Sequence, residues 1–133
     1  MKPCSVLLSL GLMSGHALAE TPRDFLVKFE SEARASSAAF SASPVRGEQF
    51  FRAAGAVDWR CSTCHSDNPS GVGKHATTGK PIEPLAPAGN SKRFVRTDTV
   101  EKWFKRNCKD VLERPCSPAE KADLMAYLLT VKR

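Results

Sequence analysis

Apolar residues near the start of the chain recur at helical spacing and predict an amphipathic helix. Thr21-Pro22 is typical of a helix start, because threonine caps a free backbone N–H and proline suits the first helical position. Phe25 and Phe29 follow four residues apart, so they share one face of the helix. We expect this helix to end within the serine- and alanine-rich segment 36–43.

A second helix is predicted over residues 44–55. Ser43-Pro44 repeats the starting pattern. Gly47 and Phe51 lie four residues apart, so a flat spot and a large aromatic side chain share one face. That face is suited to close packing against another helix.

A third helix is predicted from residue 98 onwards. Asp98-Thr99-Val100-Glu101 has the residue types and spacing of a capping box, with Asp98 as the cap. Val100, Trp103 and Phe104 then recur at i, i+3 and i+4. The next position on this apolar face is Asn107.

The last helix begins with a second capping box, Ser117-Pro118-Ala119-Glu120. Leu124, Leu128 and Val131 form its apolar stripe, with Tyr127 alongside. No repeat, low-complexity tract or linker divides the chain after residue 19, so the helices predict a single all-α domain over residues 20–133.

Cys61-Ser62-Thr63-Cys64-His65 carries the strongest chemical signal in the chain. Two thiols three positions apart, followed directly by a histidine, are typical of a c-type haem attachment site. The two sulfurs would bond to the haem vinyl groups, and His65 would be the proximal iron ligand. One covalently bound haem c is therefore the expected cofactor.

Zinc sites and thioredoxin-like redox sites also contain a Cys-x-x-Cys pair, so they are alternative interpretations of this motif. A zinc site needs further ligands at a characteristic spacing, and no second Cys-x-x-Cys or His-x-x-x-His pair follows. A thioredoxin-like dithiol is expected within a βαβ pattern, which this sequence lacks. Both alternatives are less consistent with the sequence than haem attachment.

Residues 66–97 show little periodicity and include four prolines and four glycines. An irregular segment of this length is unusual inside a compact domain unless it has a function. Wrapping the edge of a haem is such a function. Its most apolar part is Pro81 to Pro87, where we expect Ile82 and Leu85 to contact the porphyrin.

Residues 1–19 resemble an export signal. Lys2 gives the positive start, Val6 to Met13 is mostly apolar, and Ala17-Leu18-Ala19 is a small-x-small cleavage pattern. The apolar run is too short to span a membrane, so we expect a soluble, monomeric protein in the periplasm of a Gram-negative bacterium.

Charge and cysteine content agree with export. Removing residues 1–19 leaves 19 of the 20 basic residues against 14 acidic ones, a net charge of about +5, which favours an acidic protein partner. Nucleic acid is not an expected partner, because no basic run interleaved with aromatic residues is present. In an oxidising compartment Cys108 and Cys116 can close a disulfide, worth about 2–3 kcal/mol by loop entropy.

The residue facing the other side of the iron is the open question. Cytochromes that carry electrons usually use Met or His. After residue 19 only Met125, in the middle of a helix and typical of a core filler, and His75, in a loop, are available. Asn107 is either a C-terminal helix cap or part of the haem pocket, and the pattern does not choose between them.

Several motifs resemble the sphaeroides haem protein family, which consists of oxygen-binding relatives of the class I cytochromes c. The resemblance covers about residues 44–130. It is carried by Arg46-Gly47-Glu48-Gln49-Phe50-Phe51, Cys61 to His65, Thr78-Gly79-Lys80 through Leu85-Ala86-Pro87, Val100-Glu101-Lys102-Trp103, Arg106-Asn107-Cys108, Cys116, and Glu120-Lys121-Ala122-Asp123-Leu124.

The resemblance implies a class I cytochrome c fold and a role for each site residue. In that family the asparagine before the first disulfide cysteine is the sixth ligand of the oxidised haem, and it leaves on reduction so that oxygen or nitric oxide binds. Carried over, Asn107 is the displaceable ligand and Cys108–Cys116 the disulfide. Cytochrome c double-prime (cytochrome c''), a more distant resemblance, has a histidine at this position. The expected haem contacts are Cys61, Cys64, His65, Ile82, Leu85, Trp103 and Asn107.

The resemblance also implies packing and partners. Gly47 and Phe51 would cross the last helix near Leu124 and Tyr127. The implied redox partners are a dihaem cytochrome c and a membrane cytochrome b.

Two alternative functions remain open. One is electron transfer alone, with a haem that keeps six ligands in both oxidation states. The other is turnover of oxygen or nitric oxide, for which the sequence offers no distal histidine or acid–base pair, although Lys80 or Glu83 could lie near the pocket.

Overall fold

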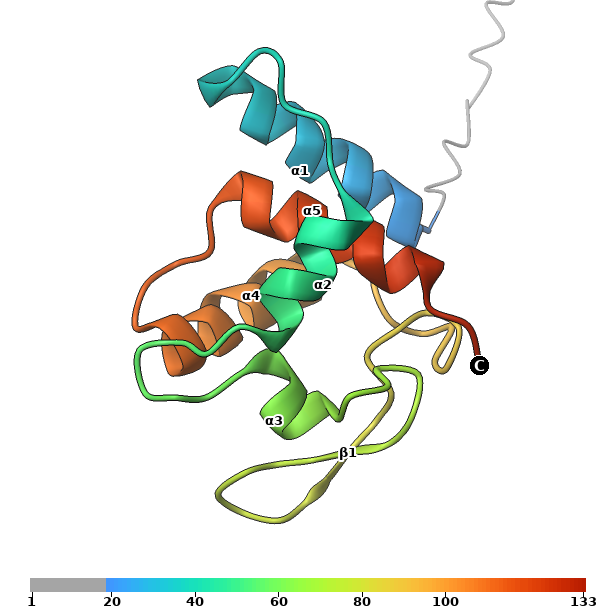
Figure 1. Cartoon of the computed structure of the whole chain (residues 1–133). Coiled ribbons are helices and arrows are strands. Elements are labelled where there is room, and N and C mark those ends of the chain that lie inside the picture. The colour runs from blue at the N-terminus through green and yellow to red at the C-terminus, as the bar shows by residue number, and fades with distance from the viewer. Residues whose placement is uncertain (1–18) are drawn as a thin grey trace, which may run out of the picture.

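The computed structural model describes residues 19–133. Within this range the chain forms helices and one short hairpin (Figure 1). The helices are α1 (Pro22–Ser36), α2 (Pro44–Arg52), α3 (Cys61–His65), α4 (Thr97–Leu112) and α5 (Pro118–Thr130), and the strands are β1 (Gly73–Lys74) and β2 (Pro81–Ile82). The predicted all-α fold is confirmed. The predicted export signal lies outside the described residues except for Ala19.

The predicted helix starts of α1, α2 and α5 are confirmed. The side chains of Thr21 and Ser43 accept hydrogen bonds from backbone N–H groups three residues later, which satisfies donors that the helix itself leaves free. Ser117 does the same for Glu120, whose carboxylate accepts in return from the Ser117 N–H. Local sequence therefore determines where these helices begin.

Helix α2 ends at Arg52, three residues before the predicted end at 55. The chain leaves the helix to reach α4, where the Ala56 N–H donates to the Val111 carbonyl at 3.0 Å. A Cβ on Gly55 would lie 1.9 Å from the same carbonyl oxygen, so the approach is possible only without a side chain. This contact between distant segments ends the helix.

The predicted capping box at Asp98 is wrong. Helix α4 begins at Thr97, and Asp98 lies in its first turn, where its carboxylate accepts from the Arg96 guanidinium at 2.6 Å. The Thr97 N–H is capped instead by the carboxylate of Glu20 at 2.6 Å. A carboxylate from a segment 77 residues away thus replaces the local cap.

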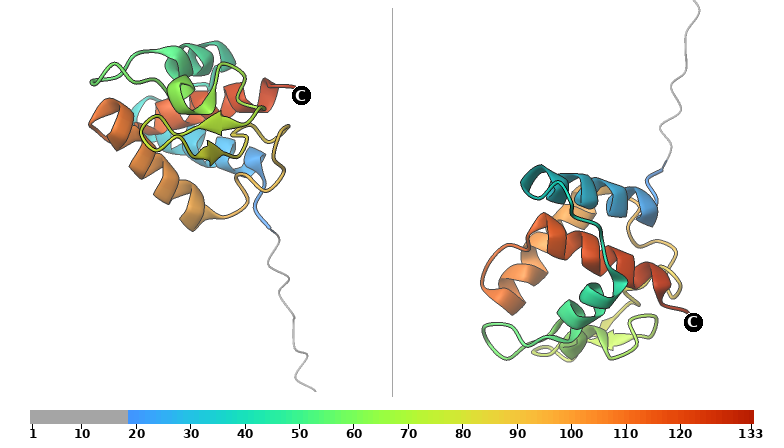
Figure 2. Two further views of the ribbon diagram at one scale, coloured as in Figure 1. Left: turned by 90° about the horizontal axis from the view of Figure 1, so that it is seen from below. Right: turned by 45° about the horizontal axis from the view of Figure 1, so that its top comes forward.

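Helix α5 is the centre of the core. It runs between α1 and α2 (Figures 1 and 2), and residues 122–128 are all buried. The predicted stripe of Leu124 and Leu128 is buried, while Val131 is the partly buried C-cap. The largest fully buried side chains are Phe25, Phe29, Phe51, Pro69, Met125 and Leu128.

Gly47 brings α2 against α5, as predicted. A Cβ at position 47 would lie 1.9 Å from the Asp123 carbonyl oxygen and 2.8 Å from the Tyr127 Cβ. Phe51 packs one turn further on, with its ring centre 5.6 Å from that of Tyr127. The buried Asp123 carboxylate accepts from the Arg46 guanidinium at 2.7 and 2.8 Å, so an ion pair closes the same interface.

Helix α4 is joined to the rest of the fold at several separate points. Phe104 packs edge-on against Phe29, with ring centres 5.3 Å apart. Glu101 bonds to Lys121 of α5 at 2.8 Å and to Lys28 of α1. A disulfide then joins its last turns to the chain before α5.

Residues 66–96 are largely irregular, as predicted, apart from the two-residue strands. These strands pair antiparallel, Gly73 with Ile82 and Lys74 with Pro81. The structure of residues 19–133 contains no helix with the length and apolar character needed to span a lipid bilayer.

Replacing Gly47 by Ala is expected to lower the free energy of unfolding by about 1–3 kcal/mol, because the added methyl group must push α2 away from α5. Thermal or denaturant unfolding measures the change. Gly71→Ala is the matched control, since the nearest atom to a Cβ there is 3.4 Å away. Equal stability of the two variants would contradict the packing described.

Replacing Glu101 by Gln is expected to cost about 1 kcal/mol near neutral pH, because its ion pairs are only partly buried. Burial raises the pKa of Glu101, but its hydrogen bonds from Lys121 and Lys28 outweigh burial and hold that pKa below the ordinary 4.5. The lowered pKa contributes stability above pH 4.5 that is lost as the pH falls through the folded-state value.

Unfolding measured from pH 7 to pH 3 should therefore show the two proteins converging in acid. Glu32→Gln, which removes only an exposed partner of Lys28, is the control and should change stability less. A constant difference between wild type and Glu101→Gln over this range would be inconsistent with the ion pairs.

Candidate functional site

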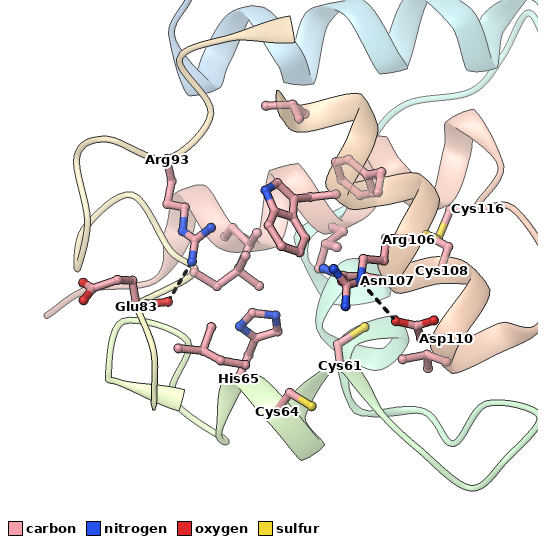
Figure 3. Close-up of a pocket in the computed structure, with 18 of the residues that line it drawn as sticks. Cys61, Cys64, His65, Glu83, Arg93, Arg106, Asn107, Cys108, Asp110 and Cys116 are labelled. Carbon is pink, nitrogen blue, oxygen red and sulfur yellow. Dashed lines mark hydrogen bonds and ion pairs between the residues drawn. A yellow bond between two sulfur atoms is a disulfide. The ribbon is translucent and has the colours of Figure 1, made fainter. Parts of the chain in front are cut away.

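A pocket of about 720 Å³ lies between α3, α4 and the irregular segment 75–96 (Figure 3). This volume is within the ~300–1,000 Å³ that is usual for small-molecule and cofactor sites. Its lining is mostly apolar. Every residue expected to contact a haem lines it, namely Cys61, Cys64, His65, Ile82, Leu85, Trp103 and Asn107.

The pocket wall at α3 is a single helical turn held from behind by β1. A Cβ on Gly73 would lie 2.2 Å from the Cys64 carbonyl oxygen and 3.1 Å from the His65 Cα. Only glycine permits this contact. The Cys64 Sγ also accepts the Ala76 N–H at 3.4 Å, so the loop after β1 positions the second thiol.

The two cysteines of α3 are free thiols. Burial, with a further contribution from Cys64, raises the pKa of Cys61 to about 11. A dithiol redox site needs the opposite shift, because the thiolate is the nucleophile. Among residues 19–133 no three His, Cys, Asp or Glu side chains are grouped as a metal ion would require, which argues against zinc.

His65 is held as a neutral imidazole. Burial, followed by the positive charge of Arg93, lowers its pKa to about 4. Its Nδ1 is buried without a hydrogen-bond partner in the described part of the chain, which is costly for a polar atom. A neutral imidazole is the form that ligates iron, so this side chain fits the proximal position of a haem.

Asn107 lies on α4, on the other side of the pocket from α3 (Figure 3). The helix continues to Leu112 and ends at Glu113, a C-cap in the left-handed conformation with φ 58°. Asn107 is therefore not the C-terminal cap, which was one of its two possible roles. Its amide forms no hydrogen bond with the residues that the structure describes.

The disulfide Cys108–Cys116 directly follows Asn107 in the chain. Both cysteines are buried, and both line the pocket. The bridge fixes the backbone of α4 next to Asn107 to the segment that leads into α5.

The other two candidate ligands are less suitably placed. Met125 is fully buried in the helical core and does not line the pocket, as predicted for a core filler. His75 lines the pocket, but its Nδ1 already accepts the N–H groups of Thr77 at 3.2 Å and Thr78 at 3.3 Å. These bonds tie the imidazole to its own turn.

Arg93 is a pocket residue that the sequence did not reveal. It is half-buried and lines the pocket together with Glu83, one of the two groups considered for proton delivery. No motif or periodicity marks an arginine in an irregular segment. Only the folded chain brings it into the same pocket as His65 (Figure 3).

Known proteins with similar sequences identify the family. The chain is 41% identical to cytochrome c'' of Methylophilus methylotrophus, over 98% of this chain and 96% of that protein. It is 38% identical to the cytochrome c-type protein SHP of Cereibacter sphaeroides, over 92% of this chain and 95% of that one. Residues 37–128 also match the model of a family described as a domain of unknown function, DUF1924.

The chain belongs to the family of cytochrome c'' and SHP. It is thus a c-type cytochrome, a class of protein that carries covalently bound haem c. The pocket fits that cofactor, since it brings two thiols and a neutral imidazole to one apolar cavity. Overall identity does not separate the two relatives.

Solved structures agree with this assignment. The oxidised cytochrome c'' of Methylophilus methylotrophus superposes with a TM-score of 0.77 at 38% identity, covering 84% of this chain and 95% of that one. Oxidised SHP, described as an oxygen-binding cytochrome c, gives a TM-score of 0.74 at 36% identity, covering 84% and 97%. The predicted fold of this c-type cytochrome is therefore confirmed.

Replacing His75 by Ala is expected to leave the ferric and ferrous absorption spectra of the haem-loaded protein unchanged, because the His75 ring is bound to its own turn. A change from a low-spin to a high-spin ferric spectrum would instead identify His75 as an iron ligand. Met125→Leu conserves volume in the core and is the corresponding test of Met125, the other candidate iron ligand.

Proposed function

We propose that this cytochrome holds one haem c and binds a diatomic ligand, oxygen or nitric oxide, in its reduced state. Cys61 and Cys64 form the two thioether bonds, and His65 is the proximal ligand. Asn107 occupies the distal side through its amide oxygen when the iron is ferric, and it leaves on reduction. The haem supplies the iron that changes oxidation state and accepts the diatomic ligand.

The placement of Asn107 is the observation that supports this proposal. It lies in the interior of α4 and lines the pocket across from α3. Of the stronger ligands, Met125 is buried in the core away from the pocket. His75 lines the pocket, but its Nδ1 accepts hydrogen bonds from its own turn. Of the three candidates, Asn107 alone lines the pocket without a hydrogen bond to the residues that the structure describes.

The chemistry of an amide explains why this ligand can leave. Its oxygen is a neutral, weak donor compared with imidazole or a thioether. Ferric iron, the harder acid, tolerates an oxygen ligand better than ferrous iron does. The disulfide at Cys108 ties the α4 backbone next to Asn107 to the segment before α5.

The relatives support the same behaviour. SHP is described as an oxygen-binding cytochrome c. The solution structure of cytochrome c'' concerns haem-ligand detachment, and it superposes on this chain with a TM-score of 0.75 at 38% identity. Both descriptions are consistent with a distal ligand that is not permanent.

Export and electron supply complete the proposal. Residues 1–19 are removed, and the protein acts in the periplasm of a Gram-negative bacterium. It receives electrons from a dihaem cytochrome c or a membrane cytochrome b, and its basic character favours an acidic docking surface on the donor.

Asn107→Ala and Asn107→His test the ligand directly. Alanine is expected to give a high-spin or water-ligated ferric spectrum. Histidine is expected to give a low-spin ferric form. Lys109→Ala, an exposed change on the same helix that does not line the pocket, should leave both oxidation states unaffected.

A ferric spectrum that is identical in wild type and both Asn107 variants would remove Asn107 from the iron. A reduced wild-type protein that stays low-spin and ignores carbon monoxide would indicate electron transfer alone. Steady consumption of oxygen or nitric oxide with a reductant, well above that of free haem, would indicate an enzyme.

A further inference from the structure

Arg93 differs from the other arginines in how its charge is balanced. The arginines at 34, 46, 52, 60, 96, 106 and 114 each lie within 4.0 Å of a carboxylate oxygen. Arg23 and Arg133 have no such partner but are exposed to water. Within residues 19–133, Arg93 alone combines partial burial with the lack of a carboxylate partner.

The Arg93 guanidinium is held in place by two backbone carbonyls. Its Nε donates to the Pro84 carbonyl at 3.0 Å, and its Nη2 donates to the Glu83 carbonyl at 2.9 Å. A guanidinium has five N–H donors, so these two bonds leave three free. The two carbonyls orient the side chain at the edge of the pocket (Figure 3), but they do not neutralise its charge.

The charge of Arg93 is only partly compensated by nearby carboxylates. Burial lowers the pKa of Arg93, and the Glu83 charge opposes that only as the smaller effect. Arg93 and His65 line the same pocket (Figure 3). A cation removed from water without a counter-ion costs free energy, and an anion inside the same pocket would recover it.

The geometry points to Arg93 as the residue that binds a propionate carboxylate of the haem. The cofactor carries its two carboxylates at one edge, and Arg93 lines the same pocket as His65, whose position fixes where the porphyrin lies. The Arg93 guanidinium is a planar fork, and its N–H groups that do not bond to the Pro84 and Glu83 carbonyls suit a planar carboxylate. This inference rests on the proposed haem attachment and adds the group that anchors the propionate edge.

Arg93→Gln tests the inference in the haem-loaded protein. A positive charge beside the haem favours the reduced state, so its loss should lower the midpoint reduction potential. The propionate bending band in the resonance Raman spectrum should shift as well, because that band reports hydrogen bonding to the carboxylate. Lys109→Gln removes the same charge from an exposed position that does not line the pocket and should leave the band unchanged.

Arg93→Lys separates charge from geometry, since it keeps the positive charge but loses the planar fork. The Arg93→Lys variant should have a midpoint reduction potential close to that of the wild type. Its propionate bending band should still shift. This variant also replaces Arg93→Gln as the test if the latter does not fold. An unchanged Raman band in the Arg93 variants, with a potential change no larger than that of Lys109→Gln, would overturn the assignment.

A third comparison distinguishes the haem carboxylate from a solvent anion. The wild-type potential should be the same in phosphate and in a buffer without multivalent anions at equal ionic strength. A potential that depends on phosphate would place a free anion at Arg93 instead. Wild-type protein that carries no haem would defeat the proposed function, whereas haem-loaded Arg93 variants identical to wild type would defeat only this inference.

Discussion

The close contact between α2 and α5 at Gly47 is the constraint on which the pocket geometry depends. Position 47 has no room for a side chain, because the Asp123 carbonyl oxygen occupies that space. Helix α2 leads through a short segment into α3, while the disulfide ties α4 to the start of α5. Both walls of the pocket are therefore positioned relative to α5, the most deeply buried helix of the described chain.

The two walls are held by different kinds of interaction. Helix α3 is backed by the contact with Gly73, which leaves its backbone little freedom. Helix α4 is held by dispersed attachments: the Glu20 cap at its first residue, the Glu101 ion pairs, Phe104, and the disulfide near its end. A rigid wall suits a permanent ligand such as His65. A side chain on the opposite wall, free of hydrogen bonds to the described residues, suits one that is released.

Burial also prepares the chemistry of the pocket before any cofactor is considered. It keeps the Cys61 thiol protonated and the His65 imidazole neutral, and it lowers the pKa of Arg93 by more than the charge of Glu83 raises it. A protonated thiol does not act as a redox nucleophile, and a neutral imidazole can ligate iron. A half-buried cation such as Arg93 is suited to pair with a carboxylate. Cytochrome c'' and SHP, which are 41% and 38% identical to this chain, share its fold.

Short-range patterns in the chain were enough to locate most helix starts, the Cys61–His65 turn, the apolar face of Val100 and Phe104, and the close approach at Gly47. Each of these depends on residues within about one or two helical turns, where sequence spacing translates directly into a shared face or a cap. The resemblance to a known family added the roles expected of Asn107 and of the disulfide.

Contacts between distant segments decided the rest. The Glu20 cap on α4 joins residues 77 apart, the early end of α2 follows from the approach of Gly55 to Val111, and Arg93 meets His65 only across the folded pocket. The position of Asn107, in a helix interior and not at its end, also depended on where α4 stops. No local pattern records such contacts, because burial and charge compensation are properties of the whole packed chain.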